Sequence, residues 1–167
     1  MMNRTAKLVL TSSALFLAFF VGRPDTAQAA LPTSTVTVTA TVAKACTISN
    51  ATLGFGEYNP TNTTDTTVTV PLNFQCSAGT PITIDLNNGG HPAAGMRGMA
   101  NGTNILQYQI YSNPGLSTVW GTGSGSNNGM TASGGSDHLD MSGKIPALQT
   151  GVIVGTYQDT VTATLNF

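Results

Sequence analysis

The most regular pattern in the chain is a strict alternation of polar and apolar residues near each end of the sequence. It runs through Thr35–Val42 and again through Thr160–Phe167, the last eight residues. A period of two places successive side chains on opposite faces of an extended chain, so each segment predicts a β-strand with one apolar face. Threonine supplies most of the polar face and suits a strand because it is β-branched.

The positions of these two segments indicate self-association. The first precedes the first cysteine, and the second ends at the last residue with no strand after it. We therefore expect a strand that is free to leave at one end and an uncovered neighbour at the other. The pattern leaves open whether Thr35–Val42 pairs within its own molecule or with another, because alternation does not say which chain a strand joins.

Between these segments the chain reads as further short strands separated by turns. Alternation recurs in Thr67–Cys76, Ile82–Leu86 and Leu106–Ile110. Asn101-Gly102 predicts a type I′ hairpin turn. Gly121–Gly135 lacks an apolar pattern and predicts a surface loop. Seven or eight short strands at this spacing favour a single all-β domain built as a two-sheet sandwich, whereas a closed barrel fits less well.

The first 29 residues have the features of a secretory signal peptide. Arg4 and Lys7 form the positive start, and Leu8–Val21 is an apolar run too short to span a bilayer. Ala27-Gln28-Ala29 fits the small-x-small cleavage pattern. We expect cleavage after Ala29 and export of the remainder; the alternative is an N-terminal membrane anchor.

Export would place the two cysteines in an oxidising compartment. In an oxidising compartment Cys46 and Cys76 most simply form one disulfide, and the alternative is two buried free thiols. The bridge would close a loop of about 30 residues and stabilise the fold by roughly 3–4 kcal/mol in the loop-entropy model.

After residue 29 the chain keeps three basic residues against six acidic ones, which gives no electrostatic basis for binding nucleic acid.

Two groups of residues are candidates for a binding or catalytic site. Asp137, His138 and Asp140 form an acid–histidine cluster, but in an extended chain Asp137 faces away from the other two. Trp120, with Tyr108 and Tyr111, would suit a sugar-binding platform, although packing within the sandwich is the simpler interpretation. A nucleophile elbow and a dinucleotide fingerprint are both missing from the sequence. We predict no catalytic residues, no metal and no cofactor.

Several segments resemble the spore coat protein U domain, in order and over nearly the whole chain after the leader. The most specific are Phe55-Gly56-Glu57-Tyr58, Leu106-Gln107-Tyr108-Gln109-Ile110-Tyr111 and Tyr157-Gln158-Asp159-Thr160-Val161. That family includes subunits of archaic, Csu-type chaperone–usher pili. The resemblance implies an incomplete immunoglobulin-like sandwich that lacks its last strand and is completed by a donor strand from another subunit, the known pilin example of strand addition.

The resemblance also implies a division of the chain and a set of partners. Residues 1–29 would be the signal peptide, 30–43 a donor-strand extension, and 44–167 the pilin domain. A periplasmic chaperone would lend a strand first, an outer-membrane usher would organise assembly, and the extension of another copy or a related subunit would replace the chaperone strand. The product would reach the cell surface through the periplasm, or be secreted.

Alternation and resemblance together identify the residues of the joint. The donor side chains would be Val36, Val38, Ala40 and Val42. The acceptor groove would be bordered by the last strand, with inward-facing Val161, Ala163, Leu165 and Phe167. Burial of one valine stabilises by about 1.5–3 kcal/mol, and a slip of one residue would bury threonines instead, so the register should be firmly set.

The sequence therefore predicts a non-enzymatic structural subunit of a pilus used for surface attachment and biofilm formation. One alternative is a secreted spore-coat or matrix protein built on the same domain. Another is a lectin-like binding module at a fibre tip, for which the 138 residues after the leader leave little room beside the predicted domain.

Overall fold

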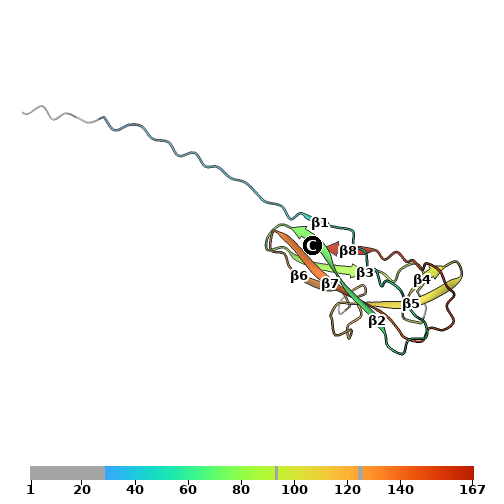
Figure 1. Ribbon diagram of the computed structural model, residues 1–167. Coiled ribbons are helices and arrows are strands. Elements are labelled where there is room, and N and C mark those ends of the chain that lie inside the picture. Colours follow the sequence, from blue (N-terminus) through green and yellow to red (C-terminus); the bar gives the residue numbers. More distant parts are fainter. Residues whose placement is uncertain (1–28, 93, 124–125) are drawn as a thin grey trace, which may run out of the picture. The chain divides into compact units, whose positions relative to one another are not determined.

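The computed structural model describes residues 29–92, 94–123 and 126–167, so the predicted signal peptide lies outside the described residues except for its last position. The chain divides between Thr39 and Ala40 into two units, which are described separately. Residues 29–45 contain neither helix nor strand (Figure 1). From Cys46 onward the described residues form strands, turns and loops, without a helix that could cross a membrane.

The described part of the domain contains eight strands in two antiparallel sheets (Figure 1). The strands are β1 (Cys46–Ile48), β2 (Thr66–Cys76), β3 (Pro81–Leu86), β4 (Arg97–Asn101), β5 (Asn104–Tyr111), β6 (Asn128–Thr131), β7 (Ser136–Ile145) and β8 (Ala163–Asn166). One sheet has the order β1-β2-β7-β5-β4, and the other has the order β6-β3-β8. This confirms the predicted all-β sandwich.

The core comes from the alternating segments because each presents its apolar face to the space between the sheets. The buried side chains of β2, β3 and β5 are Leu72, Phe74, Cys76, Ile82, Ile84, Leu86, Leu106, Tyr108 and Ile110. Trp120 is fully buried, and its indole N–H donates to the Ile84 carbonyl over 2.7 Å. The predicted faces of these three strands are therefore confirmed.

Pro71 lies inside β2 without disturbing the sheet. At this position β2 pairs with Asp140 of β7, whereas β1 pairs only with the last residues of β2, from Phe74 onward. A proline nitrogen has no hydrogen to donate, so it is tolerated where a strand has a partner on one side only.

Two local predictions were wrong. Part of Gly121–Gly135 is the strand β6, which pairs with β3; Gly129 lies against the Ile82 carbonyl, where a side chain would collide. β6 pairs with β3 through backbone atoms, and this pairing leaves no pattern of apolar residues in the sequence. In the β4–β5 hairpin Asn101 pairs with Asn104, and the turn is Gly102-Thr103. Gly102, with φ 60°, therefore occupies the first central position, as in a type II′ turn rather than type I′.

Arg97 is a buried cation whose hydrogen bonds link the β4–β5 hairpin to the end of β3 in the other sheet. Only 1% of it is exposed, and its guanidinium donates to the carbonyls of Leu86, Asn87 and Trp120 and to the Gln109 side chain. Burial lowers the pKa of Arg97, but the carbonyls satisfy its N–H groups. No local pattern in the sequence predicts this burial.

Candidate functional site

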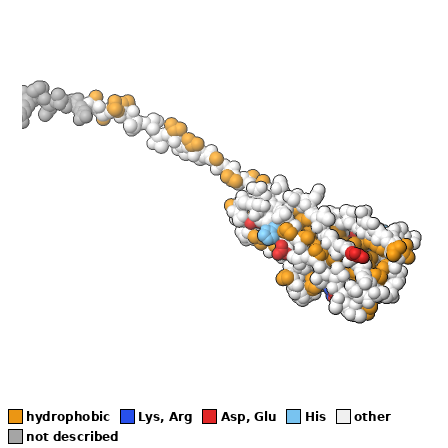
Figure 2. All heavy atoms as spheres, in the orientation of Figure 1, with side chains coloured by type: hydrophobic (Ala, Val, Ile, Leu, Met, Phe, Trp, Pro, Cys, Tyr) orange, Lys and Arg blue, Asp and Glu red, His pale blue; other side chains and the backbone are white. Residues whose placement is uncertain are grey.

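A groove with an apolar floor lies open between the two sheets. β1 is one edge strand of the larger sheet and β8 is one edge strand of the smaller sheet, and a cavity of about 740 Å³ lies between the chain segments next to them. Its floor is made of core side chains: Leu72, Leu86, Tyr108, Ile110 and Met141. Figure 2 shows hydrophobic side chains reaching the surface over much of the domain face in view. A sandwich core that is open along one side lacks a covering strand.

One wall of the groove is a segment that lies mostly outside the strands, with a left-handed Gly56 (φ 71°) and a largely unpaired backbone. It follows β1, runs from Ile48 to Tyr58, and turns Leu53 and Phe55 toward the core. Within the described residues, the main chain of Asn50–Tyr58 takes part in no hydrogen bond. Unpaired backbone beside apolar surface is a template for adding a strand.

The opposite wall leads into β8. Residues 157–163 line the first cavity, and β8 pairs with β3 on one side only within the described sheets. A second cavity of about 560 Å³ continues the groove and shares Leu53, Phe55, Met99 and Tyr157 with the first. It is lined on one side by residues up to Pro60 and on the other by Val152–Tyr157. The two walls thus run in opposite directions along one continuous groove.

A partly buried hydrogen bond holds this opposite wall in place. The Tyr108 hydroxyl donates to the Asp159 carboxylate over 2.6 Å, and the backbone N–H of Gly90 donates to the other carboxylate oxygen over 2.8 Å. Burial, together with this hydrogen bond to a carboxylate, raises the pKa of Tyr108 well above its ordinary value. The Tyr108 ring also meets Phe55 edge-on, with ring centroids 6.0 Å apart, so one side chain contacts both walls.

The four predicted acceptor residues differ in their surroundings. Val161 and Ala163 line the groove and are half-buried. Leu165 is half-buried against the core but lies outside the groove lining. Phe167, predicted to face inward, lies beyond the end of β8 and is 56% exposed.

The four predicted donor residues are exposed. Val36, Val38 and Val42 keep 82%, 87% and 87% of their surface accessible. Ala40 is exposed as well, and none of the four lies in a strand of the described structure. Three large apolar side chains at alternate positions, all facing water, mark a segment whose apolar face has no partner in the isolated chain.

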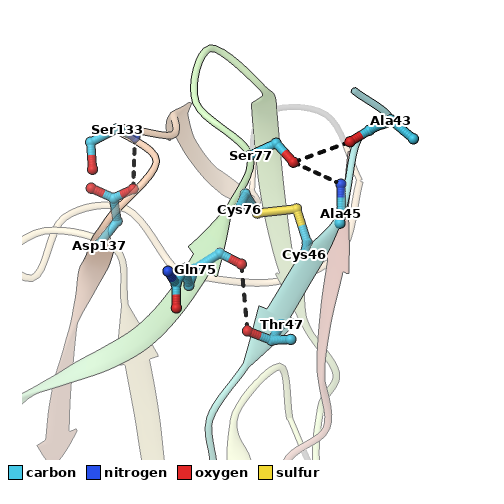
Figure 3. Close-up of a disulfide and its surroundings, with 9 residues drawn as sticks. All are labelled: Ala43, Ala45, Cys46, Thr47, Gln75, Cys76, Ser77, Ser133 and Asp137. Atoms are coloured by element: carbon cyan, nitrogen blue, oxygen red, sulfur yellow. Dashed lines mark hydrogen bonds between the residues drawn. A yellow bond between two sulfur atoms is a disulfide. The ribbon is translucent and has the colours of Figure 1, made fainter. Parts of the chain in front are cut away.

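The segment joining this extension to β1 is fixed by Ser77 and the disulfide (Figure 3). Cys46 and Cys76 form the predicted disulfide. The Ser77 hydroxyl accepts from the Ala45 N–H over 3.2 Å and donates to the Ala43 carbonyl over 3.3 Å. The backbone on both sides of Lys44 is therefore held against the end of β2.

The residues weighed as other sites have structural roles. His138 and Asp140 lie on the surface with Nε2 and Oδ1 3.9 Å apart, while the Asp137 carboxylate accepts from the Ser133 N–H. Interaction with the Ser133 side chain, together with this backbone hydrogen bond, lowers the pKa of Asp137. Within the described residues no three His, Cys, Asp or Glu side chains are grouped to hold a metal ion. Trp120 and Tyr108 are core residues, so they do not form an exposed aromatic platform.

Comparison with known proteins identifies the domain. The family description "Spore Coat Protein U domain" matches residues 32–164. Protein U of Myxococcus xanthus is 33% identical over 181 aligned positions, with 98% of each chain covered.

Solved structures of pilus proteins share the fold. One is the CsuC–CsuE chaperone–tip adhesion subunit complex from the archaic Csu pili of Acinetobacter baumannii, with 28% identity and a TM-score of 0.58. The match covers 76% of the present chain but 40% of the chain compared. The P pilus rod subunit PapA matches over 72% of this chain and 97% of its own, with a TM-score of 0.54. Its identity is 13%, so that likeness concerns the fold alone.

Proposed function

We propose that this chain, which belongs to the spore coat protein U domain family, is a structural subunit of a chaperone–usher pilus and polymerises by donating its N-terminal strand to the next copy. The proposal is based on two features of the described chain. A groove with an apolar floor is open along the sandwich, and the alternating N-terminal segment has exposed valine side chains.

The chemistry of the two features is complementary. A strand laid in the groove would bring Val36, Val38 and Val42 onto a floor of leucine, isoleucine and methionine side chains. At about 1.5–3 kcal/mol for each fully buried valine, the joint would gain several kcal/mol from apolar burial. Its backbone would also pair with β8 and with the unpaired main chain of Asn50–Tyr58.

The direction of the walls favours exchange between molecules. The two walls run in opposite directions, so a strand between them is antiparallel to one and parallel to the other. We infer that it is antiparallel to β8 and runs in the direction of Ile48–Tyr58, because β8 belongs to a sheet and all strand pairs in the described sheets are antiparallel. Its C-terminal end would then lie beside Tyr58, whereas Cys46 lies at the opposite end. Ala43–Ala45 span at most about 11 Å against a wall of about 36 Å, so a chain cannot fill its own groove in this direction.

This role is mechanical rather than enzymatic. Until the extension of another copy arrives, the open groove needs a temporary strand, which explains a periplasmic chaperone as partner and an outer-membrane usher as the site of exchange. The fibre would be exported through the periplasm to the cell surface, where it would serve attachment and biofilm formation. Related pilus subunits would be accepted by the same groove.

A second candidate function is a spore-coat or matrix protein that uses the same joint without an usher. Its support is the match to Protein U of Myxococcus xanthus over 98% of both chains. Gene disruption separates the two candidates. Loss of surface fibres after disruption of a chaperone or usher gene beside this one supports the pilus, and unchanged assembly supports the coat.

Strand donation itself is tested with the purified chain. The exported chain should form oligomers that resist dilution, while deletion of residues 30–43 should leave a monomer. A peptide of residues 31–43, added during refolding, should bind the truncated chain with a stoichiometry of one and raise its melting temperature. Oligomers that persist after the deletion would overturn the proposal.

A further inference from the structure

Two charged side chains of opposite sign are left without a partner in the described structure, one at the base of the extension and one on the groove. Three basic residues follow the predicted signal peptide: Arg97 is buried among carbonyls, and Lys144 lies 3.2 Å from Asp65. The third, Lys44, is exposed and forms no ion pair or side-chain hydrogen bond with the described residues.

Glu57 is its counterpart among the acids. It is exposed, lines the second cavity, and likewise forms no ion pair or hydrogen bond through its side chain with the described residues. The other five acidic residues after the leader each accept a hydrogen bond or lie near a basic group: Asp65, Asp85, Asp137, Asp140 and Asp159.

The length of the groove places these two residues together in a joint between copies. The wall Ile48–Tyr58 has eleven residues, and the stretch Ser34–Lys44 also has eleven. With Val36 placed near the β1 end, a donor strand running in the direction of that wall would bring Lys44 to the end where Glu57 lies. The second cavity at this end is lined by Val152, Ile153 and Val154, whose apolar side chains suit the aliphatic stem of a lysine.

The donor copy also holds Lys44 ready for this contact. Ser77 bonds the backbone on both sides of it, through the Ala43 carbonyl and the Ala45 N–H (Figure 3). Lys44 continues the even-numbered series of Val38, Ala40 and Val42, so in an extended donor strand its side chain would point toward the groove of the acceptor. A cation at this position ends the apolar series and stops the strand from sliding further into the groove.

We propose that Lys44 of each copy pairs with Glu57 of the copy whose groove it enters, and that this contact sets the register of the joint. The inference rests on the proposed strand donation and adds a polar stop to it. Attraction between the two groups also steers the extension toward the correct end of the groove, because opposite charges raise the rate of encounter.

A charge exchange tests the pair. Lys44→Glu and Glu57→Lys each place like charges in every joint, and the double variant restores an opposite pair with the signs reversed. We expect each single variant to lower the joint association constant roughly three- to tenfold, and the double variant to recover most of the loss. The difference should shrink in about 1 M salt, where the screening length is near 3 Å.

Asp140→Lys is the matched control for Glu57→Lys, because it makes the same charge change on exposed β7, away from the groove lining. Oligomerisation is followed by sedimentation, and the melting temperature of the truncated domain confirms that each variant folds. Unchanged association in both single variants, or failure of the double variant to recover it, overturns the Lys44–Glu57 pair while leaving strand donation intact. A parent chain that stays monomeric overturns the proposed function itself.

Discussion

Truncation of one donor valine should weaken every joint without affecting the domain. Val38 is 87% exposed in the isolated chain, so its side chain contributes little to folding before assembly. In the groove it would be buried, and Val38→Ala removes two methyl groups from that contact. At about 0.8 kcal/mol for each buried carbon, the joint loses about 1.5 kcal/mol, roughly a tenfold reduction of its association constant.

Thr39→Ala is the matched control, because it also shortens a β-branched side chain to a methyl group but on the face that would remain in water. Sedimentation over a range of concentrations gives the association constants of the parent chain and both variants. Melting of the truncated domain with added variant peptide gives a second reading. A Thr39→Ala effect as large as that of Val38→Ala would refute the assignment of the even-numbered face to the groove.

Two further predictions concern the stability of the domain. Tyr108→Phe removes the 2.6 Å hydrogen bond to Asp159 and should lower the free energy of unfolding by about 1.5–3 kcal/mol, measured by urea denaturation; an unchanged midpoint would contradict a structural role. Hydrogen bonding from the Ala147 N–H lowers the pKa of Asp65 below the ordinary value of 3.8. The ionised Asp65 therefore contributes its full stabilisation above pH 3.8, and this stabilisation is lost as the pH falls through the lowered pKa. Acidification from about pH 6 to about pH 3 should therefore destabilise the parent chain more than Asp65→Asn, and an equal loss in both would contradict this.

The strands that could be predicted are those whose apolar face is buried against the other sheet. Ile82–Leu86 and Leu106–Ile110 could be predicted because a strand that is buried on one face has alternating apolar residues. The apolar residues of both segments are buried, as expected. The strand β6 could not be found in the same way. Its contact with β3 is made by backbone atoms, and Gly129 is there because a side chain would collide.

The candidate site was visible from the sequence only in part. The alternation of Thr35–Val42 predicts an apolar face, and exposure of its valines leaves that face unpaired. The buried polar contacts could not be predicted from periodicity: Arg97 lies in a turn-flanked stretch, and the Tyr108–Asp159 contact joins residues 51 positions apart, although both of these residues stand in segments that resemble the family. A single polar residue is buried by contacts from distant strands, and local periodicity carries no information about those contacts.

We propose that the domain lacks one strand and that its own N-terminal segment has the sequence to supply it. The most direct measurement uses a permuted chain in which Leu31–Ala43 follows Phe167 through a Gly/Ser linker, so that the segment can enter its own groove antiparallel to β8. Its mass in solution and its melting temperature are compared with those of the unpermuted chain after removal of the signal peptide. We expect the permuted chain to be a monomer with a higher melting temperature, and the unpermuted chain to polymerise or to need a chaperone. A stable unpermuted monomer that gains nothing from the permutation would contradict it.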